Sequence, residues 1–522
     1  MAVLAPVLLA PLGALFGAAA AFTDCHRIDR VEVVRHDIFE ARDGGEVAWP
    51  YRLANRLRFR TREGVIRREL LFSSDQCADA ETLAQSERNL RGTGFLRDAR
   101  VETSPAESGQ PGAVDVRVST WEKWTTAPQL GFAQVGNRSV WTVGIAERNL
   151  FGRGLHVEVQ RRSDIDRDQT LLAFRDPGVA GSRVQAAASY ADRSDGRRTE
   201  LGVARPFFSL DTRWAFAARA DAFEQLDPLY QAGERVADLA HEGRALDLEA
   251  GHAIGRTPDG ALRLHGAYRY RRDRVETDLR RFGIAEAGLT FVQHRYLRLT
   301  HVNRFERAED FNLGYRLSAA AGVSLPALGG GKETAFFLAA GGRKGLPLGR
   351  ERFLIGEASW TGRRTGGRWE NGLADARMGG AFRLAPRALL LTQARYRHGV
   401  NLDPETQLTI GAQNGLRGYA VNQWAGSRSL LLGTEARFFV ADDVAQLLSF
   451  ALAAFGEMGY AWSRGTDVNL RDLRSDIGLG VMVGRNRLTS RPLRMDVAYA
   501  FNPPPGRSRW QVSMGVQLSF VD

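Results

Sequence analysis

"RWQVSMGVQLSFVD" (509–522) alternates apolar and polar side chains along its whole length. Successive side chains of a β-strand point to opposite faces, so this period of two predicts a strand with one apolar and one polar face. The apolar face would hold Trp510, Val512, Met514, Val516, Leu518 and Phe520, and the polar face Gln511, Ser513, Gly515, Gln517 and Ser519.

The same alternation recurs at 262–271, 431–440 and 493–501, and no convincing helix follows residue 125. A soluble β-sandwich also alternates. However, an unbroken run of strands about nine or ten residues long fits a sheet that crosses a bilayer better. In lipid every backbone group must be paired within the protein, so such a sheet must close.

We therefore expect a mainly β protein whose residues 123–522 form a transmembrane antiparallel β-barrel. About 16 strands would leave about 25 residues for each strand and its connection. Fourteen or eighteen strands would also fit this length.

The first part of the chain has a different pattern. Residues 1–21 are uncharged and end in small residues, with Ala19 and Ala21 placed as in a secretory cleavage site, so we expect a signal peptide. Residues 22–122 then predict a small α+β domain in the order strand, helix, helix, strand, strand. Its segments are 27–35, 61–72, 79–96 and two short strands around the loop 105–112.

Composition excludes several classes of function. The net charge is +11, but the arginines alternate with acids along the chain, so we expect no nucleic-acid partner. Cys25 and Cys77 are the only cysteines; they could form one disulfide in an oxidising compartment or remain two thiols. No metal-ligand spacing, nucleotide loop or nucleophile elbow occurs, so we expect no metal, no cofactor and no enzymatic activity.

Three stretches carry a family resemblance. "ERNLRGTGFLRDARVE" (87–102) resembles the second helix, glycine turn and following strand of a POTRA module. "AERNLFGRGLHVEVQ" (146–160) resembles an early barrel hairpin of the BamA/TamA family of outer-membrane assembly factors, and "GLRGY" (415–419) resembles that family's inserted-loop signature. The hairpin motif comprises Asn149, Leu150, Phe151, Gly152 and Gly154.

The resemblance implies that the loop motif folds back into the barrel lumen. A buried Arg417 then needs a carboxylate partner, because an unpaired buried charge costs several kcal/mol. "FGEMGYAW" (455–462) resembles the family's inward-facing acid motif and makes Glu457 the expected partner, with Asp476 and Glu435 as second candidates. The loop motif comprises Gly415, Leu416, Arg417, Gly418 and Tyr419.

The function that the resemblance implies is insertion or translocation of client proteins at the bacterial outer membrane. A periplasmic POTRA domain would capture an extended client on a sheet edge, at 101–106 or 27–35. The seam between first and last strands would open, with Gly515 and Phe520 on the last strand. Expected partners are outer-membrane lipid and lipopolysaccharide, an unfolded or periplasmic client protein, and periplasmic accessory proteins. The alternative is a porin-like or lipid-conducting channel whose POTRA docks a partner.

Overall fold

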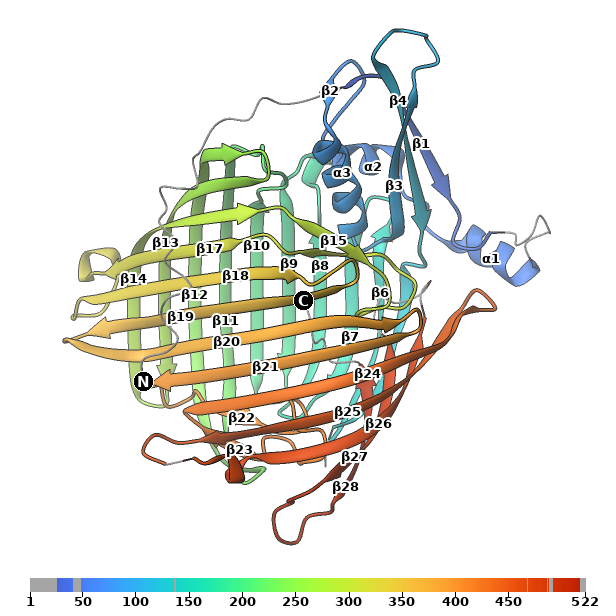
Figure 1. Ribbon diagram of the computed structural model, residues 1–522. Coiled ribbons are helices and arrows are strands. Elements are labelled where there is room, and N and C mark those ends of the chain that lie inside the picture. Colours follow the sequence, from blue (N-terminus) through green and yellow to red (C-terminus); the bar gives the residue numbers. More distant parts are fainter. Residues whose placement is uncertain are drawn as a thin grey trace.

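The structure, a computed structural model, describes residues 26–40, 48–135, 138–466, 468–485, 487 and 492–516. It consists of a small N-terminal domain and a large closed barrel, and the domain lies against one end of the barrel (Figure 1). The expected signal peptide, residues 1–21, falls outside the described residues.

The N-terminal domain contains the predicted order of elements with two additions, helix α1 and the two-residue strand β2. Its sheet has the order β2-β1-β4-β3, in which β1 runs parallel to β4 and β3 runs antiparallel to β4. The elements are β1 (His26–His36), α1 (Trp49–Leu57), α2 (Glu63–Glu69), β2 (Cys77–Ala78), α3 (Ala80–Gly92), β3 (Leu96–Pro105) and β4 (Ala113–Glu122).

Local chemistry explains where α3 begins and which face it buries. The Asp79 side chain accepts a hydrogen bond from the backbone N–H of Thr82 at 2.7 Å, which satisfies one of the free donors at the helix start. Leu90 then packs, together with Ile66 of α2, against Ile28 of β1 in the core of the domain. Cys77 pairs through its backbone with Arg27, whereas Cys25 lies outside the described residues, so the disulfide stays a prediction.

Twenty strands close the barrel, all antiparallel to their neighbours, within the described part of the chain. They are β5 (Thr126–Val135), β6 (Arg138–Leu150), β7 (Leu155–Ser163), β8 (Asp168–Asp176), β9 (Gln185–Arg193), β10 (Gly196–Arg205), β11 (Trp214–Gln231), β12 (Glu234–Thr257), β13 (Gly260–Val275), β14 (Asp278–Gln293), β17 (Arg316–Ser324), β18 (Ala335–Pro347), β19 (Arg352–Thr365), β20 (Arg368–Ala385), β21 (Ala388–Val400), β24 (Arg428–Val444), β25 (Leu448–Trp462), β26 (Arg474–Gly484), β27 (Leu493–Ala500) and β28 (Trp510–Val516).

The expected sixteen strands were therefore wrong. That number assumed about 25 residues for each strand and its connection. Many connections are instead minimal: β11 and β12, β13 and β14, and β19 and β20 are each joined by the two residues left between them. Such turns shorten the repeat and make room for four more strands.

Two further hairpins lie outside the barrel sheet. β15 (Tyr296–Leu299) pairs with β16 (Glu309–Asn312) between β14 and β17, and β22 (Leu408–Ile410) pairs with β23 (Trp424–Gly426) between β21 and β24. Short 3₁₀ turns occur at η2 (Val179–Gly181), η3 (Pro326–Leu328) and η4 (Leu470–Asp472).

The barrel strands place apolar side chains outside and polar ones inside. On β24, Phe438 and Val440 are about half exposed, whereas Glu435 and Arg437 are almost fully buried. This arrangement is the reverse of a soluble protein and is typical of a barrel surrounded by lipid. No helix in the described residues is long and apolar enough to cross a membrane.

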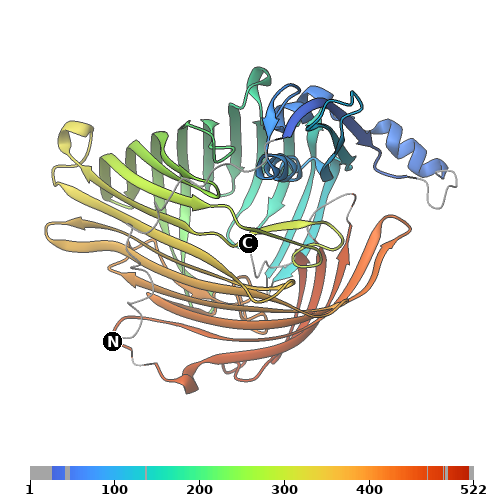
Figure 2. The same ribbon diagram turned by 45° about the horizontal axis from the view of Figure 1, so that its top comes forward.

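The two inserted segments enter the barrel from opposite ends. The Tyr51 hydroxyl of the N-terminal domain donates to the carbonyl of Ala445, in the turn after β24, so this strand ends beside the domain and begins at the far end. The connection 401–427, which precedes β24, therefore enters from the far end. The β15–β16 hairpin lies at the end that carries the domain (Figures 1 and 2).

Candidate functional site in the barrel lumen

The connection 401–427 folds back into the lumen and buries its central residues. Leu416 and Tyr419 pack with Ile410, Leu431 and Ala500 in one apolar cluster, with Trp424 against it. Tyr419 and Trp424 form an edge-to-face ring pair with centroids 4.8 Å apart. The aromatic residues of this loop thus fasten it to the inner wall.

Arg417 is 4% exposed and contacts acids on three strands of the wall. Its Nε donates to Glu457 Oε1 of β25 at 3.0 Å, and one terminal nitrogen donates to Glu435 Oε2 of β24 at 3.1 Å. The same nitrogen reaches Asp496 Oδ2 of β27 at 3.2 Å. The guanidinium carbon also lies 3.4 Å from the ring centroid of Phe455. The loop is therefore held by a charge network and a cation–π contact together.

The backbone of the loop is held by acids as well. The N–H of Arg417 donates to Glu457 Oε2 at 2.9 Å, and the N–H of Gly418 donates to Asp476 Oδ2 at 2.8 Å. Asp476, expected as a second partner of the guanidinium, binds the main chain of the loop instead. A Cβ at residue 418 would lie 2.8 Å from the Asp476 Cβ, so only glycine permits this approach.

Three members of the network were not singled out from the sequence. Arg494 donates to Glu435 at 2.8 Å and to Asp496 at 2.6 Å, and Arg437 donates to Glu435 at 2.7 Å. Three arginines thus face three acids, which is how buried charges avoid a large desolvation penalty. The alternation of side chains in 493–501 could have pointed to two of them, because it places Arg494 and Asp496 on the polar face of the strand, which lines the lumen.

The hairpin motif of 149–154 docks the N-terminal domain onto the barrel. Asn149 is fully buried, and its amide donates to Thr61 Oγ1 at 2.9 Å. Its own Oδ1 accepts the N–H of Gly154 at 2.8 Å, which shapes the turn. Gly152 has φ +71° and its carbonyl accepts the N–H of Arg62 at 2.9 Å. The glycines turn the chain, and because they lack a side chain they also allow the domain and the barrel to approach closely.

The β15–β16 hairpin was not predicted and occupies the lumen beside the N-terminal domain. Val302 and Phe305 pack against Phe353, Leu391 and Phe439, which are buried while their neighbours along the strands face outward. Backbone carbonyls of the hairpin are bound by wall arginines, including Val302 by Arg437. The sequence pattern did not predict that this hairpin enters the lumen, because short apolar segments are equally compatible with a turn on the surface.

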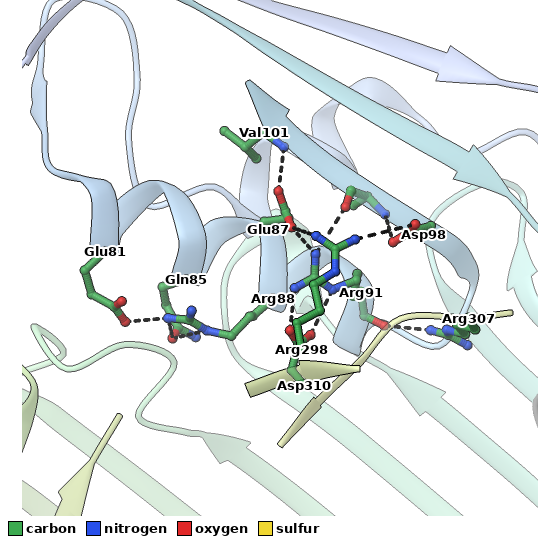
Figure 3. Close-up of polar contacts among 11 residues, drawn as sticks. Glu81, Gln85, Glu87, Arg88, Arg91, Asp98, Val101, Arg298, Arg307 and Asp310 are labelled. Carbon is green, nitrogen blue, oxygen red and sulfur yellow. Dashed lines mark hydrogen bonds and ion pairs between the residues drawn. The ribbon is translucent and has the colours of Figure 1, made fainter. Parts of the chain in front are cut away.

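The outer side of the hairpin binds helix α3 of the domain (Figure 3). Arg91 donates two parallel hydrogen bonds to the Asp310 carboxylate, at 2.8 and 2.7 Å. Arg298 donates to Glu87 Oε1 at 3.0 Å, and Arg307 donates to the Arg91 carbonyl at 2.8 Å. The hairpin therefore connects the inner wall of the barrel to the N-terminal domain.

The seam of the barrel lies between β28 and β5. Among the described residues one pair, Met514 with Gln134, joins the two strands. Gly515 lies at this seam, where an added Cβ would come within 3.1 Å of the Ala133 Cβ. Phe520, expected on the same strand, lies outside the described residues.

A second part of the lumen is lined by charged residues of β8 to β13. They border a cavity of about 850 Å³ and form cross-strand ion pairs, such as Arg198 with Asp221 at 2.9 Å and Arg271 with Asp247 at 2.8 Å. This wall carries balanced charge. No group of three or more acids, histidines or cysteines that could hold a metal occurs among the described residues.

No protein-family model matches the sequence, and no curated protein matches it. Solved structures with a similar outline include CdiB from Acinetobacter baumannii, which is 12% identical with a TM-score of 0.47 and covers 94% of this chain and 74% of that chain. BamA from Haemophilus ducreyi lacking POTRA domains 1–3 is 13% identical, with a TM-score of 0.42 and coverage of 94% and 84%. CdiB from Escherichia coli is 12% identical, with a TM-score of 0.43 and coverage of 98% and 93%. At these scores the likeness is too distant to assign a family or an activity.

Proposed function

We propose that this protein is an outer-membrane barrel of the BamA/TamA type, which inserts or translocates client proteins. The N-terminal domain would act as a single periplasmic POTRA module. The proposal rests on the family motifs in the sequence and on the physical arrangement of the lumen.

The observation that carries the proposal is that two separate segments occupy the lumen, one from each end. The loop around Arg417 is clamped by acids of three strands, and the β15–β16 hairpin is packed on the wall near the domain. Two buried segments narrow the lumen from both ends. A barrel that opens only when a client is present needs such obstructions.

The edge of β3 offers a surface for client capture. This strand pairs with β4 on one side only, and residues 102–105 are exposed. An extended client segment could add to this edge through main-chain hydrogen bonds. The other expected edge, β1, lies between β2 and β4 instead. β2 pairs only with the first residues of β1, and farther along Arg67 donates to the Val31 carbonyl and Arg60 to the Arg35 carbonyl.

Client capture at β3 would be coupled to the hairpin. The outward N–H of Val101 donates to Glu87 Oε2 at 2.9 Å, and the other oxygen of this carboxylate binds Arg298 of the hairpin. A client strand that pairs with Val101 must displace Glu87. Displacement would break the bond between Arg298 and Glu87 and so loosen the contact between α3 and the hairpin.

The alternative is a porin-like or lipid-conducting channel, which the charged wall of β8 to β13 favours. Recordings in a planar bilayer distinguish the two. A gated assembly factor should give small, unstable conductance, whereas a porin should give large, steady conductance. Depletion of the protein in cells should lower the amounts of specific outer-membrane proteins, and unchanged amounts would favour the channel.

Cross-linking tests client capture directly. A photoreactive residue in place of Thr103, on the exposed part of β3, should form adducts with an extended client protein. The matched control is the same residue in place of Arg117, which is exposed on β4 but lies on a central strand. Equal adducts at both positions would contradict edge capture.

A further inference from the structure

Helix α1 presents an apolar face that no described residue covers. Trp49, Leu53 and Leu57 are spaced four residues apart, so they share one side of the helix. Their exposed fractions are 69%, 47% and 66%, and no residue of α1 is buried. A helix with such a face is unusual on a small soluble domain, where apolar stripes turn toward the core.

The opposite side of α1 is fixed to the protein. Tyr51 stacks on Phe39 with ring centroids 4.6 Å apart, and the Asn55 amide donates to the Phe39 carbonyl at 2.8 Å. The Tyr51 hydroxyl donates to the Ala445 carbonyl at 2.6 Å. These contacts orient the helix, so the exposure of its apolar face is a property of the folded chain.

The place of α1 continues the apolar outer surface of the barrel. Ala445 lies in the turn between β24 and β25, and both figures show α1 beside the ends of these strands and outside the barrel (Figures 1 and 2). Val440, Val444 and Leu448, which flank this turn, are themselves exposed. The apolar face of the helix thus lies near the rim of the surface that would contact lipid.

The charged residues of α1 also suit a membrane surface. Arg52 and Arg56 are exposed and follow one flank of the apolar face. Helices that lie in a membrane interface combine Trp and Leu on one face with Arg or Lys on the other, and they bind anionic lipid best.

We infer that α1 is an interfacial helix that inserts Trp49, Leu53 and Leu57 into the periplasmic leaflet of the outer membrane, next to β24 and β25. The inference rests on the proposed location of the barrel in that membrane. It gives the N-terminal domain a second attachment, to lipid, in addition to its contact with the β15–β16 hairpin.

Fluorescence quenching by brominated lipids tests the inference. The full chain is reconstituted into liposomes whose phospholipid acyl chains carry bromine, and the emission of Trp49 is obtained as the difference between the wild type and W49F. We expect most of the Trp49 emission to be lost in brominated liposomes. The double variant L53D/L57D should restore it, while V236D, an exposed apolar residue on the far β11–β12 hairpin, should leave the quenching unchanged.

The role of charge is tested separately. The variant R52Q/R56Q should reduce quenching in liposomes with anionic lipid and should have less effect in purely zwitterionic liposomes. Equal effects in both lipids would show that the arginines do not contact headgroups and would overturn that part of the inference.

Failure of the inference can be told apart from failure of the proposed location. Unquenched Trp49 emission in a protein that floats with the liposomes and keeps a folded barrel would overturn the interfacial helix alone. A protein that does not float would overturn the membrane barrel itself. Emission from Trp49 that shifts with protein concentration in lipid-free detergent would show that a second copy covers the face, which also overturns the inference.

Discussion

At the scale of single residues, Arg417 determines how the inserted loop is held. Its guanidinium and backbone together reach three wall acids, and the side chain is almost fully removed from solvent. The network stabilises the loop because every charge in it has a partner. A charge left unpaired in the lumen would lose its solvation without compensation.

Replacing Arg417 by Ala should therefore lower the free energy of unfolding by about 3–5 kcal/mol, since three carboxylates lose their shared counter-charge. The measurement is the urea midpoint of the detergent-solubilised barrel. R350A, which removes an exposed arginine in a turn, should change stability by no more than about 0.5 kcal/mol. An unchanged midpoint for R417A would show that the buried network does not stabilise the barrel.

A second residue, Lys123, lies at the junction of domain and barrel and is 4% exposed. Burial, together with the nearby charges of Arg307, Arg148 and Arg304, lowers the pKa of Lys123 from its usual 10.5 to about 7. Between these two values the unfolded chain binds more protons than the folded chain, so the free energy of unfolding should rise as the pH is raised from about 7 toward about 10.5.

The variant K123M should flatten this rise, because it removes the titrating group. Urea midpoints measured across that pH range provide the test. K332M, which removes an exposed lysine, should keep the pH dependence of the wild type. The same slope in K123M and in the wild type would refute the role of Lys123.

At the scale of elements, α3 is the part that connects client capture to the lumen. One carboxylate, that of Glu87, accepts the edge N–H of Val101 and also binds Arg298 of the hairpin. A client strand that displaces Glu87 from Val101 would therefore also weaken the attachment of the hairpin to α3.

The variant E87A should expose the Val101 amide and speed its hydrogen exchange, since its hydrogen-bond acceptor is gone. Mass spectrometry of peptides from β3 measures this exchange. E81A is the matched control on the same helix, because Glu81 binds Arg88 and makes no contact with β3. Equal exchange in the two variants would show that Glu87 does not protect the Val101 amide on the edge strand.

At the scale of the whole molecule, two inserted segments and the N-terminal domain form a continuous series of contacts. The loop is attached to β24, β25 and β27, and Arg437 of β24 also binds the hairpin, which binds α3 in turn. A change at the domain can thus reach the lumen through packed and charged contacts.

The variant F305D should undock the hairpin, because Phe305 is 1% exposed and packs on Phe439. We expect its conductance in a planar bilayer to rise several-fold over that of the wild type. V236D, at the far end of the barrel, should conduct like the wild type. No increase with F305D, in a barrel shown to be folded, would mean that the hairpin does not obstruct the lumen.

Much of the fold followed from local patterns. The alternation of side chains predicts strands from 125 onward, because a strand with two different environments must repeat every two residues. The order of elements in residues 22–122 was also readable, apart from α1 and the short strand β2. The helix was missed because none of its residues is fully buried, so the chain carries no core-facing stripe there.

The candidate site was only partly readable from sequence. The motif 415–419 indicated a loop that needs an acid, and the structure places Glu457 and Glu435 at the guanidinium and Asp476 at the main chain. The sequence did not predict that Asp496, Arg494 and Arg437 join this network. Their contacts depend on which strands become neighbours in the barrel, and no single segment of sequence contains that information.

The sequence by itself determined that the second part of the chain is a sheet with one polar and one apolar face, since alternation is a property of each strand alone. Only the tertiary structure decided how many strands close the barrel, because that number depends on turn lengths and on the register of all neighbours together. It also decided that the β15–β16 hairpin turns inward, because this depends on contacts with strands far along the chain, whose apolar side chains receive Phe305.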